Sequence, residues 1–158
     1  MSELEQELGE VLIARHLTIA TAESCTGGLI SNRITNISGS SNYFERGVIT
    51  YSNRAKIELL NVPSVTIEQF GAVSPETATA MAVGVKELAH TDIGLGVTGI
   101  AGPTGGTPEK PVGLVYIGIF GNNKKETHEF NFKGSRIEIK NQTADAALKI
   151  ILGFVNKI

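Results

Sequence analysis

The chain has 158 residues, of which 41% are hydrophobic and 19% are charged, and its formal net charge is -2. These values are typical of one folded domain over residues 1–158, and they argue against a disordered chain or a membrane protein. The single cysteine, Cys25, excludes an internal disulfide framework and is typical of a reducing compartment, so we expect a cytoplasmic location. Interspersed charges leave no basic stripe for nucleic acid, and three distant histidines predict no metal site.

Hydrophobic periodicity and turn residues predict the elements in chain order. In the first part of the chain we expect a helix over 2–16, a strand over 17–22, a short helix ending near 35, a strand over 47–51 and a short helix ending near 60. In the second part we expect a helix from 75 to about 90, a strand over 93–98, a hairpin of strands over 112–120 and 125–132, and a last helix over 136–156. The helix after residue 74 has the clearest start, because Ser74 fits the N-cap and Pro75 the first turn. Strands alternating with helices, plus one hairpin, indicate an α/β sandwich with a mixed, mostly parallel sheet of about five strands.

The first candidate site is the segment Ser24-Cys25-Thr26-Gly27-Gly28, which leaves the end of a strand and enters a helix. Ligands bind at this position in open α/β sheets, and glycines let backbone N–H groups approach a substrate closely. Ser24 or Cys25 could serve as a nucleophile beside an oxyanion hole. We favour Ser24, because a buried lone thiol is usually inert. The alternative is a tight turn in which Ser24 or Thr26 acts only as the N-cap.

The second candidate site, Tyr51 to Lys56, also follows a strand end and enters a helix. With Ser52 or Asn53 as the N-cap, Lys56 falls in the first turn, where the helix dipole disfavours a positive charge. The dipole should lower the pKa of Lys56, and a lowered pKa suits a general base near neutral pH. The alternative is a solvated surface lysine beside a tyrosine in the core.

The third candidate site is the glycine-rich segment between two predicted strands, Gly99 to Lys110. Backbone N–H groups of such a loop can wrap a phosphate, and Lys110 adds positive charge. The segment matches neither a Walker A loop nor a dinucleotide-binding fingerprint. Arg136, in the first turn of the last helix, also opposes the helix dipole and could hold a phosphate or a carboxylate. The alternative for the segment is a long connection or lid.

Together these segments resemble the CinA C-terminal domain family, which includes nicotinamide mononucleotide deamidases. The resemblance spans nearly the whole chain and rests on motifs in family order: Ala22-Glu-Ser-Cys-Thr-Gly-Gly28, Gly47-Val-Ile-Thr-Tyr-Ser-Asn53 with Lys56, Gly71-Ala-Val-Ser74, Thr98-Gly-Ile-Ala-Gly-Pro103, and Gly105-Gly-Thr107 with Lys110-Pro-Val-Gly113. It implies a three-layer α/β/α sandwich. Many members carry an additional N-terminal domain, and because this chain begins directly at its first helix we expect the standalone form.

The resemblance implies hydrolysis of the carboxamide of nicotinamide mononucleotide to nicotinate mononucleotide and ammonia, a step of pyridine nucleotide salvage. It also implies Ser24, Tyr51 and Lys56 as the catalytic set. In the expected mechanism Lys56, with Tyr51 between or beside them, takes the proton of Ser24, and Ser24 attacks the carboxamide carbon. Backbone N–H groups of Thr26-Gly27-Gly28 hold the oxyanion, and no metal or other cofactor takes part. The sequence leaves open whether Tyr51 or Lys56 is the immediate base.

We expect the glycine-rich loop to bind the ribose phosphate, with Arg136 as a helper. The residues predicted to bind substrate are Thr26, Gly27, Gly28, Gly99, Ala101, Gly102, Gly105, Gly106, Thr107, Lys110 and Arg136. The family commonly has Gly-Asp-Arg and a second arginine where this chain has Gly134-Ser135-Arg136 and Lys140, so weaker phosphate binding is expected if these residues hold the phosphate. Two alternatives remain, a nucleotide-binding regulatory module without catalysis and an amidase for another small amide. The expected partner is a small nucleotide, neither nucleic acid nor membrane, and a homo-oligomer stays open.

Overall fold

A five-stranded sheet forms the centre of the computed structural model, which describes residues 2–158. The strands are β1 (Ile19–Glu23), β2 (Phe44–Ile49), β3 (Ile93–Gly99), β4 (Leu114–Gly121) and β5 (Lys124–Asn131). Their order across the sheet is β2-β1-β3-β4-β5. β1 pairs in parallel with β2 and β3, whereas β4 and β5 are added antiparallel. The prediction of an α/β protein with a mixed sheet of about five strands is confirmed.

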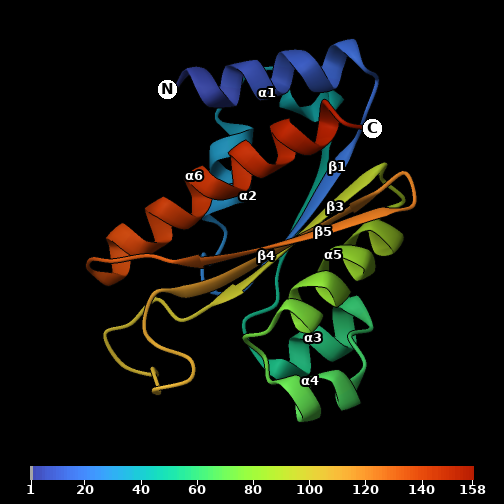
Figure 1. The fold of residues 1–158 in the computed structure, drawn as a ribbon. Coiled ribbons are helices and arrows are strands. Elements are labelled where there is room, and N and C mark those ends of the chain that lie inside the picture. Colours follow the sequence, from blue (N-terminus) through green and yellow to red (C-terminus); the bar gives the residue numbers. More distant parts are fainter. Residues whose placement is uncertain (1) are drawn as a thin grey trace.

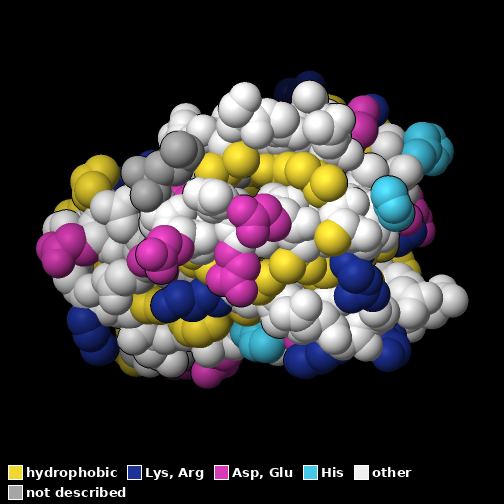
Figure 2. Space-filling view, turned by 90° about the horizontal axis from the view of Figure 1, so that it is seen from above, with side chains coloured by type: hydrophobic (Ala, Val, Ile, Leu, Met, Phe, Trp, Pro, Cys, Tyr) yellow, Lys and Arg dark blue, Asp and Glu magenta, His cyan; other side chains and the backbone are white. Residues whose placement is uncertain are grey.

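Helices cover both faces of this sheet, as Figure 1 shows. One face carries α1 (Glu3–Ala14), α2 (Leu29–Thr35) and α6 (Arg136–Val155), and the other carries α3 (Asn53–Leu60), α4 (Ser64–Phe70) and α5 (Pro75–Ala89). A short 3₁₀ helix, Ser40–Asn42, precedes β2. The three-layer α/β/α sandwich is therefore confirmed. Figure 2 views the molecule from the side of α1 and α6, where acidic and basic side chains are mixed and apolar side chains form bands between them.

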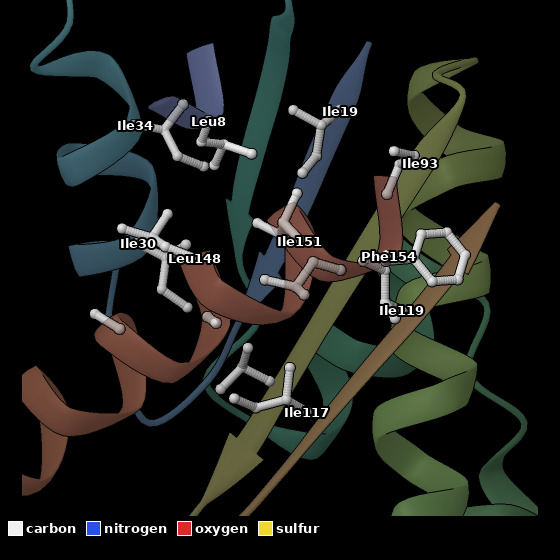
Figure 3. Packing of buried hydrophobic residues seen from close by; sticks show 14 of the residues in the cluster. Leu8, Ile19, Ile30, Ile34, Ile93, Ile117, Ile119, Leu148, Ile151 and Phe154 are labelled. Carbon is white, nitrogen blue, oxygen red and sulfur yellow. The ribbon is translucent and has the colours of Figure 1, made fainter. Parts of the chain in front are cut away.

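The larger hydrophobic core lies between the sheet and α6 (Figure 3). Leu148, Ile151 and Phe154 recur every three residues along α6 and point at the strands. Ile117 and Ile119, alternate residues of β4, point back at them because successive strand residues face opposite sides of a sheet. All five side chains are buried, and each contributes about 1.5–3 kcal/mol to folding. This packing fixes the position of α6, whose first turn lies at the edge of the sheet described below.

The opposite face of the sheet meets α5 through glycines. A Cβ atom at Gly96 of β3 would lie 2.5 Å from the carbonyl oxygen of Ala78, and one at Gly118 of β4 would lie 2.7 Å from the same oxygen. A side chain at either position would therefore collide with the main chain of the helix. Because glycine has no Cβ, the backbones of α5 and the two strands come into direct contact.

Most predicted elements are present, with shifted ends. β2 begins at Phe44 rather than at Gly47. Ser74 is the N-cap of α5, as predicted, and its hydroxyl accepts a hydrogen bond from the N–H of Thr77. The prediction had no helix at α4, which has no buried residue and therefore no hydrophobic periodicity in its sequence.

The carboxyl ends of β1, β2 and β3 lie at one edge of the sheet, because these strands are parallel. Each of the three candidate segments follows one of these ends: Ser24 follows β1, Tyr51 follows β2, and the glycine-rich loop follows β3. The start of α6 lies at the same end of the molecule (Figure 1). The topology thus gathers segments that are far apart in the sequence at the edge where open α/β sheets bind ligands.

Candidate active site

A cavity of about 330 Å³ opens at this edge of the sheet. Its walls are formed by Ser24, Cys25, Tyr51, Asn53, Lys56, Ala72, Val73, Thr98, Gly99, Ile100, Ala101, Gly102, Thr104, Gly105 and Arg136. All three candidate segments and the first turn of α6 contribute to this set. The volume lies within the range of about 300–1,000 Å³ that is usual for small-molecule sites.

Ser24 and Lys56 are in direct contact inside the cavity, with 3.1 Å between Oγ and Nζ. The same Nζ donates to the backbone oxygens of Thr50, at 3.0 Å, and Tyr51, at 3.2 Å. A protonated lysine has three N–H donors, and here each of them has an acceptor. In a neutral lysine, two N–H groups stay on the two carbonyls and the lone pair faces the hydroxyl of Ser24. The surroundings of Nζ therefore suit both protonation states.

Lys56 is almost completely buried, with 1% of its surface exposed. Burial lowers the pKa of the ammonium group below 10.5, because the charged form loses its contact with water. The hydroxyl of Ser52, the N-cap of α3, accepts from the N–H of Ala55 at 3.0 Å, which puts Lys56 in the first turn as predicted. The predicted direction of the pKa shift is correct, but the leading cause is burial rather than the helix dipole. The alternative of a solvated surface lysine is wrong.

Tyr51 contributes its main chain and its side chain at different places. Its backbone oxygen accepts from Lys56, whereas the side chain is 61% exposed at the rim, so it is not a core tyrosine. Its hydroxyl accepts from Arg136 at 3.1 Å. Arg136 also donates to the backbone oxygen of Gly102 at 2.7 Å, which ties the start of α6 to the glycine-rich loop. The contact between Tyr51 and Lys56 is therefore made by the main chain, and the phenol pairs with Arg136.

Cys25 lines the cavity beside Ser24, but it is buried. Burial raises the pKa of its thiol to about 12, so the reactive thiolate is scarce at neutral pH. The hydroxyl of Ser24 lies within hydrogen-bond distance of the amine of Lys56, a group that can accept its proton when neutral. These properties favour Ser24 over Cys25 as the nucleophile.

The turn that carries Ser24 is held by Glu23, a residue to which the sequence analysis gave no role. Glu23 is fully buried at the end of β1, and its carboxylate accepts hydrogen bonds from the backbone N–H groups of Gly28, Ile30 and Ser31. It also accepts from the hydroxyls of Thr26 and Ser31. The carboxylate thus caps α2 from the preceding strand. An acidic residue at a strand end, before a glycine turn into a helix, is the signal that could have indicated this cap.

Some backbone N–H groups of this turn donate to acceptors of the turn itself. The N–H of Gly27 donates to the backbone oxygen of Ser24 at 3.1 Å, and the N–H of Gly28 donates to the buried carboxylate at 3.2 Å. Within residues 2–158, the N–H groups of Cys25 and Thr26 have no acceptor on another residue. Thr26, Gly27 and Gly28 do not line the cavity wall, whereas Cys25 does.

The structure divides the glycine-rich loop into two parts. Its first part lines the cavity with Gly99, Ala101, Gly102 and Gly105, and its later predicted residues, Gly106, Thr107 and Lys110, lie outside the wall. The ammonium group of Lys110 donates to the backbone oxygen of Phe70 at 2.7 Å. The backbone N–H of Lys110 donates to the hydroxyl of Thr107 at 3.0 Å, which closes a turn. Lys110 therefore joins this loop to α4, and the structure does not bring it to the cavity.

Ser135 is the N-cap of α6. Its hydroxyl accepts from the N–H of Glu138, and the carboxylate of Glu138 accepts from the N–H of Ser135, both at 3.2 Å. This capping box places Arg136 at the first position of the helix. Lys140, one turn later, reaches toward the turn after β1, where its Nζ lies 3.7 Å from the position of a Cβ on Gly27.

Three further polar residues line the cavity without having been predicted, namely Asn53, Thr98 and Thr104. Thr98 is buried at the end of β3, and its hydroxyl donates to the backbone oxygen of Ala72 at 2.8 Å. Asn53 begins α3 beside Ser52. Their positions next to strand ends, inside segments already singled out, are the signal that could have found them.

A second hollow, of about 490 Å³, lies between β5 and α6. It is larger than the cavity beside Ser24, but it contains none of the predicted catalytic or binding residues. Over residues 2–158, no group of three or more His, Cys, Asp or Glu side chains is placed to hold a metal ion. None of the described helices combines the length and apolar character needed to cross a membrane.

Known proteins resemble this chain over most of its length. A relative from Moorella thermoacetica, provisionally named a competence-damage inducible protein, is 54% identical over 148 residues, which are 94% of this chain and 36% of that protein. A CinA-like protein from Kosmotoga olearia is 51% identical, with the same coverage. The chain thus spans little more than a third of the length of these relatives.

Two crystal structures match the fold as well as the sequence. The competence/damage inducible protein CihA from Agrobacterium tumefaciens is 40% identical with a TM-score of 0.91, and the match covers 99% of this chain and 98% of that one. A CinA superfamily protein from Klebsiella pneumoniae is 30% identical with a TM-score of 0.95 and the same coverage. The family model described as the CinA C-terminal domain matches residues 1–155. The chain therefore belongs to the CinA C-terminal domain family.

Proposed function

We propose that this protein is an amidohydrolase that converts nicotinamide mononucleotide and water into nicotinate mononucleotide and ammonia. The observation that carries the proposal is the buried contact of 3.1 Å between Ser24 Oγ and Lys56 Nζ in a cavity large enough for a small molecule. A module that only binds nucleotides has no need of a buried lysine with a lowered pKa facing a serine hydroxyl. The substrate is the one that the family resemblance implies.

In the proposed first step, neutral Lys56 takes the proton of Ser24 while the serine oxygen attacks the carboxamide carbon. Two carbonyl acceptors hold the amine with its lone pair toward Ser24, so the proton moves along an existing contact. The backbone oxygen of Tyr51 is the other neighbour of the serine hydroxyl, but it lies farther away, at 3.5 Å. The phenol of Tyr51 pairs with Arg136 at the exposed rim, which favours Lys56 over the phenol as the immediate base.

Charge then develops on the carboxamide oxygen, and backbone N–H groups are its natural donors. We assign this role to the N–H of Cys25, which lines the cavity and, within residues 2–158, donates to no other residue. The residue after a nucleophile supplies the same donor in other hydrolases with a strand-to-helix turn. The N–H groups of Gly27 and Gly28 are already occupied, so the glycines serve mainly to shape the turn.

Collapse of the tetrahedral intermediate breaks the carbon–nitrogen bond, and protonated Lys56 returns its proton to the departing nitrogen, which leaves as ammonia. Water then attacks the ester on Ser24, with Lys56 again as base, and releases the carboxylate product. Arg136 has N–H donors beyond the two that bind Tyr51 and Gly102, and these suit the phosphate of a mononucleotide. In this proposal the phenol of Tyr51 positions Arg136 and lines the entrance.

The test is ammonia release from nicotinamide mononucleotide by the purified protein without added metal, with Ser24→Ala as the variant. We expect equal amounts of ammonia and nicotinate mononucleotide from the parent and none from the variant, which should still bind the nucleotide. Ser40→Ala, at a serine that is also buried but does not line the cavity, is the matched control and should stay active. Added hydroxylamine should divert the acyl-enzyme to the hydroxamate.

Each other result has a definite meaning. Tight nucleotide binding without ammonia release by the parent would favour a regulatory binding module. Ammonia from nicotinamide riboside or another small amide, but not from the mononucleotide, would keep the mechanism and change the substrate. Activity in Ser24→Ala that is lost in Cys25→Ala would move the nucleophile to the cysteine.

A further inference from the structure

We propose that Glu23 is a positioning residue that holds the Ser24 nucleophile in place, and that its carboxylate does so from inside the protein without touching substrate. The proposal rests on the proposed function, because it assumes that Ser24 is the nucleophile. It assigns a catalytic consequence to a buried acid that takes no part in the proton transfers described above.

The carboxylate of Glu23 makes five hydrogen bonds, all to the turn and to the start of α2. Oε1 accepts from the hydroxyl of Thr26 at 2.7 Å and from the N–H groups of Gly28 at 3.2 Å and Ile30 at 2.9 Å. Oε2 accepts from the N–H and the hydroxyl of Ser31, at 2.9 Å and 2.6 Å. Hydrogen bonds to an ionised carboxylate are stronger than those between neutral groups, and burial removes the competition of water. The carboxylate is therefore the common anchor of residues 26–31.

Ser24 lies between two fixed points. On one side, its own N–H donates to the backbone oxygen of Val97 at 3.0 Å, and the backbone oxygen of Glu23 accepts from the N–H of Thr50 at 2.9 Å. These bonds extend the sheet on both sides of β1. On the other side, the chain that follows Ser24 is tied back by the carboxylate of Glu23. Removal of this anchor leaves the chain after Ser24 with only the hydrogen bond from the N–H of Gly27 to the backbone oxygen of Ser24 within the turn.

Neighbouring side chains at the end of β1 point to opposite sides of the sheet. Thr21 and Glu23 point toward α2, where both contact Ser31. Ser24 points the other way, toward Lys56 of α3. Glu23 thus holds the turn from the face opposite the cavity, and this separation is what makes it a positioning residue rather than a catalytic one.

The same bonds decide which backbone donors remain for the reaction. With the carboxylate on the start of α2, the N–H groups of Gly28, Ile30 and Ser31 are satisfied internally. Within residues 2–158, the N–H groups of Cys25 and Thr26 donate to no other residue, and Cys25 lines the cavity beside the nucleophile. A loosened turn would disturb both the serine and the N–H of Cys25, which act together in the transition state. The cost should therefore appear in kcat more than in KM.

Glu23→Gln is the test, because the amide has nearly the same shape but carries two N–H donors in place of one oxygen. In either orientation the amide nitrogen faces at least one backbone N–H that needs an acceptor. We expect kcat for nicotinamide mononucleotide to fall by about 100-fold, the size expected when a reacting group is displaced by about 1 Å, with KM changed by less than about threefold. Glu5→Gln is the matched control, since Glu5 is also buried and pairs with Arg33, outside the cavity wall. The kcat of Glu5→Gln should remain that of the parent, even if its unfolding free energy falls as much as that of Glu23→Gln.

Equal kcat in Glu23→Gln and the parent would overturn the proposal, and so would equal loss of kcat in both glutamate variants at matched stability. If Glu23→Gln does not fold, Ser31→Ala carries the test, because it removes the hydroxyl bond to Oε2 and, besides it, only the contact with the hydroxyl of Thr21. Its kcat should fall by about tenfold, the equivalent of one charge-assisted hydrogen bond, and an unchanged kcat would contradict the proposal.

Acetylation of Ser24 by p-nitrophenyl acetate, followed by mass spectrometry, separates this proposal from the choice of substrate. If the parent is acetylated at Ser24 but does not turn over nicotinamide mononucleotide, the proposed substrate fails, and slower acetylation in Glu23→Gln still supports the positioning role. If the parent is not acetylated at Ser24 and releases no ammonia, there is no nucleophile to position and both proposals fail.

Discussion

Replacement of Lys56 by methionine tests the proposed base most directly. The change keeps most of the side-chain volume and removes the group that lies 3.1 Å from Ser24 Oγ. General-base catalysis contributes about 10²–10⁴-fold to a rate, so kcat should fall by about 10³-fold. Stability should change little, because two opposing effects are of similar size. The backbone oxygens of Thr50 and Tyr51 lose a donor, at about 1–3 kcal/mol for each buried group left without a partner, while the cost of burying an ammonium group disappears.

The pH dependence gives a second readout with a definite sign. In the parent, kcat/KM should rise with pH as Lys56 loses its proton and should level off above its pKa, which burial lowers below 10.5. Because the folded protein binds fewer protons than the unfolded chain between these two pKa values, the free energy of unfolding should also rise with pH in that window. Both slopes should be absent or reduced in Lys56→Met.

The assay is ammonia release across pH, paired with urea unfolding at the same pH values. Lys149→Met, at an exposed lysine of α6 outside the cavity wall, is the matched control and should keep the activity and the pH profile of the parent. Residual activity above about a tenth of the parent, or an unchanged ascending limb in Lys56→Met, would refute the assignment of Lys56 as the base.

Three further outcomes follow from the geometry. Cys25→Ala should keep kcat within about twofold. The thiol of the parent should react slowly with iodoacetamide at neutral pH, because burial raises its pKa to about 12. Rapid alkylation that abolishes activity would contradict this expectation. Arg136→Lys should raise KM for nicotinamide mononucleotide by about tenfold, since lysine cannot reach Gly102 and Tyr51 together. KM for nicotinamide riboside, which has no phosphate, should change little. Equal effects on both substrates would argue against a phosphate contact. Ser135→Ala removes the N-cap of α6 and should lower the unfolding free energy by about 1 kcal/mol in urea titrations, whereas unchanged stability would show that the capping box is dispensable.

The sequence predicted the parts of the fold that depend on local pattern. Ser74 and Pro75 located the start of α5. The glycine that ends β4 and the two asparagines after it located the hairpin, whose turn residues Asn122 and Asn123 have positive φ angles. The strand order could not be predicted from local patterns, because pairings such as β1 with β3 join segments about 70 residues apart and depend on the whole chain. α4 was missed because it buries no residue and contains Val65, Thr66 and Ile67, whose β-branched side chains are weak helix formers.

In the candidate site, too, local patterns predicted single residues but not the contacts between distant ones. Single residues at strand ends could be selected from the sequence, and the structure brings Ser24, Tyr51, Lys56 and Arg136 to one cavity. Their partners could not be selected, because a contact such as the phenol of Tyr51 on Arg136 spans 85 positions. Lys110 shows the same limit: charge and spacing predict a phosphate contact, whereas the structure places its ammonium group on the backbone oxygen of Phe70, outside the cavity wall.

The contact between α5 and the glycines of the sheet has a consequence for how the cavity tolerates change in the sequence. Ala72 and Val73 of the cavity wall directly precede Ser74, the N-cap of α5, and Thr98 of the wall is the last residue but one of β3, which the helix touches at Gly96. The spacing of these two walls is thus set by main-chain contacts between α5 and the sheet. Exchanges among the apolar side chains of the α6 layer leave this spacing unchanged. A side chain at Gly96 or Gly118 would change it directly, because it would collide with the main chain of α5.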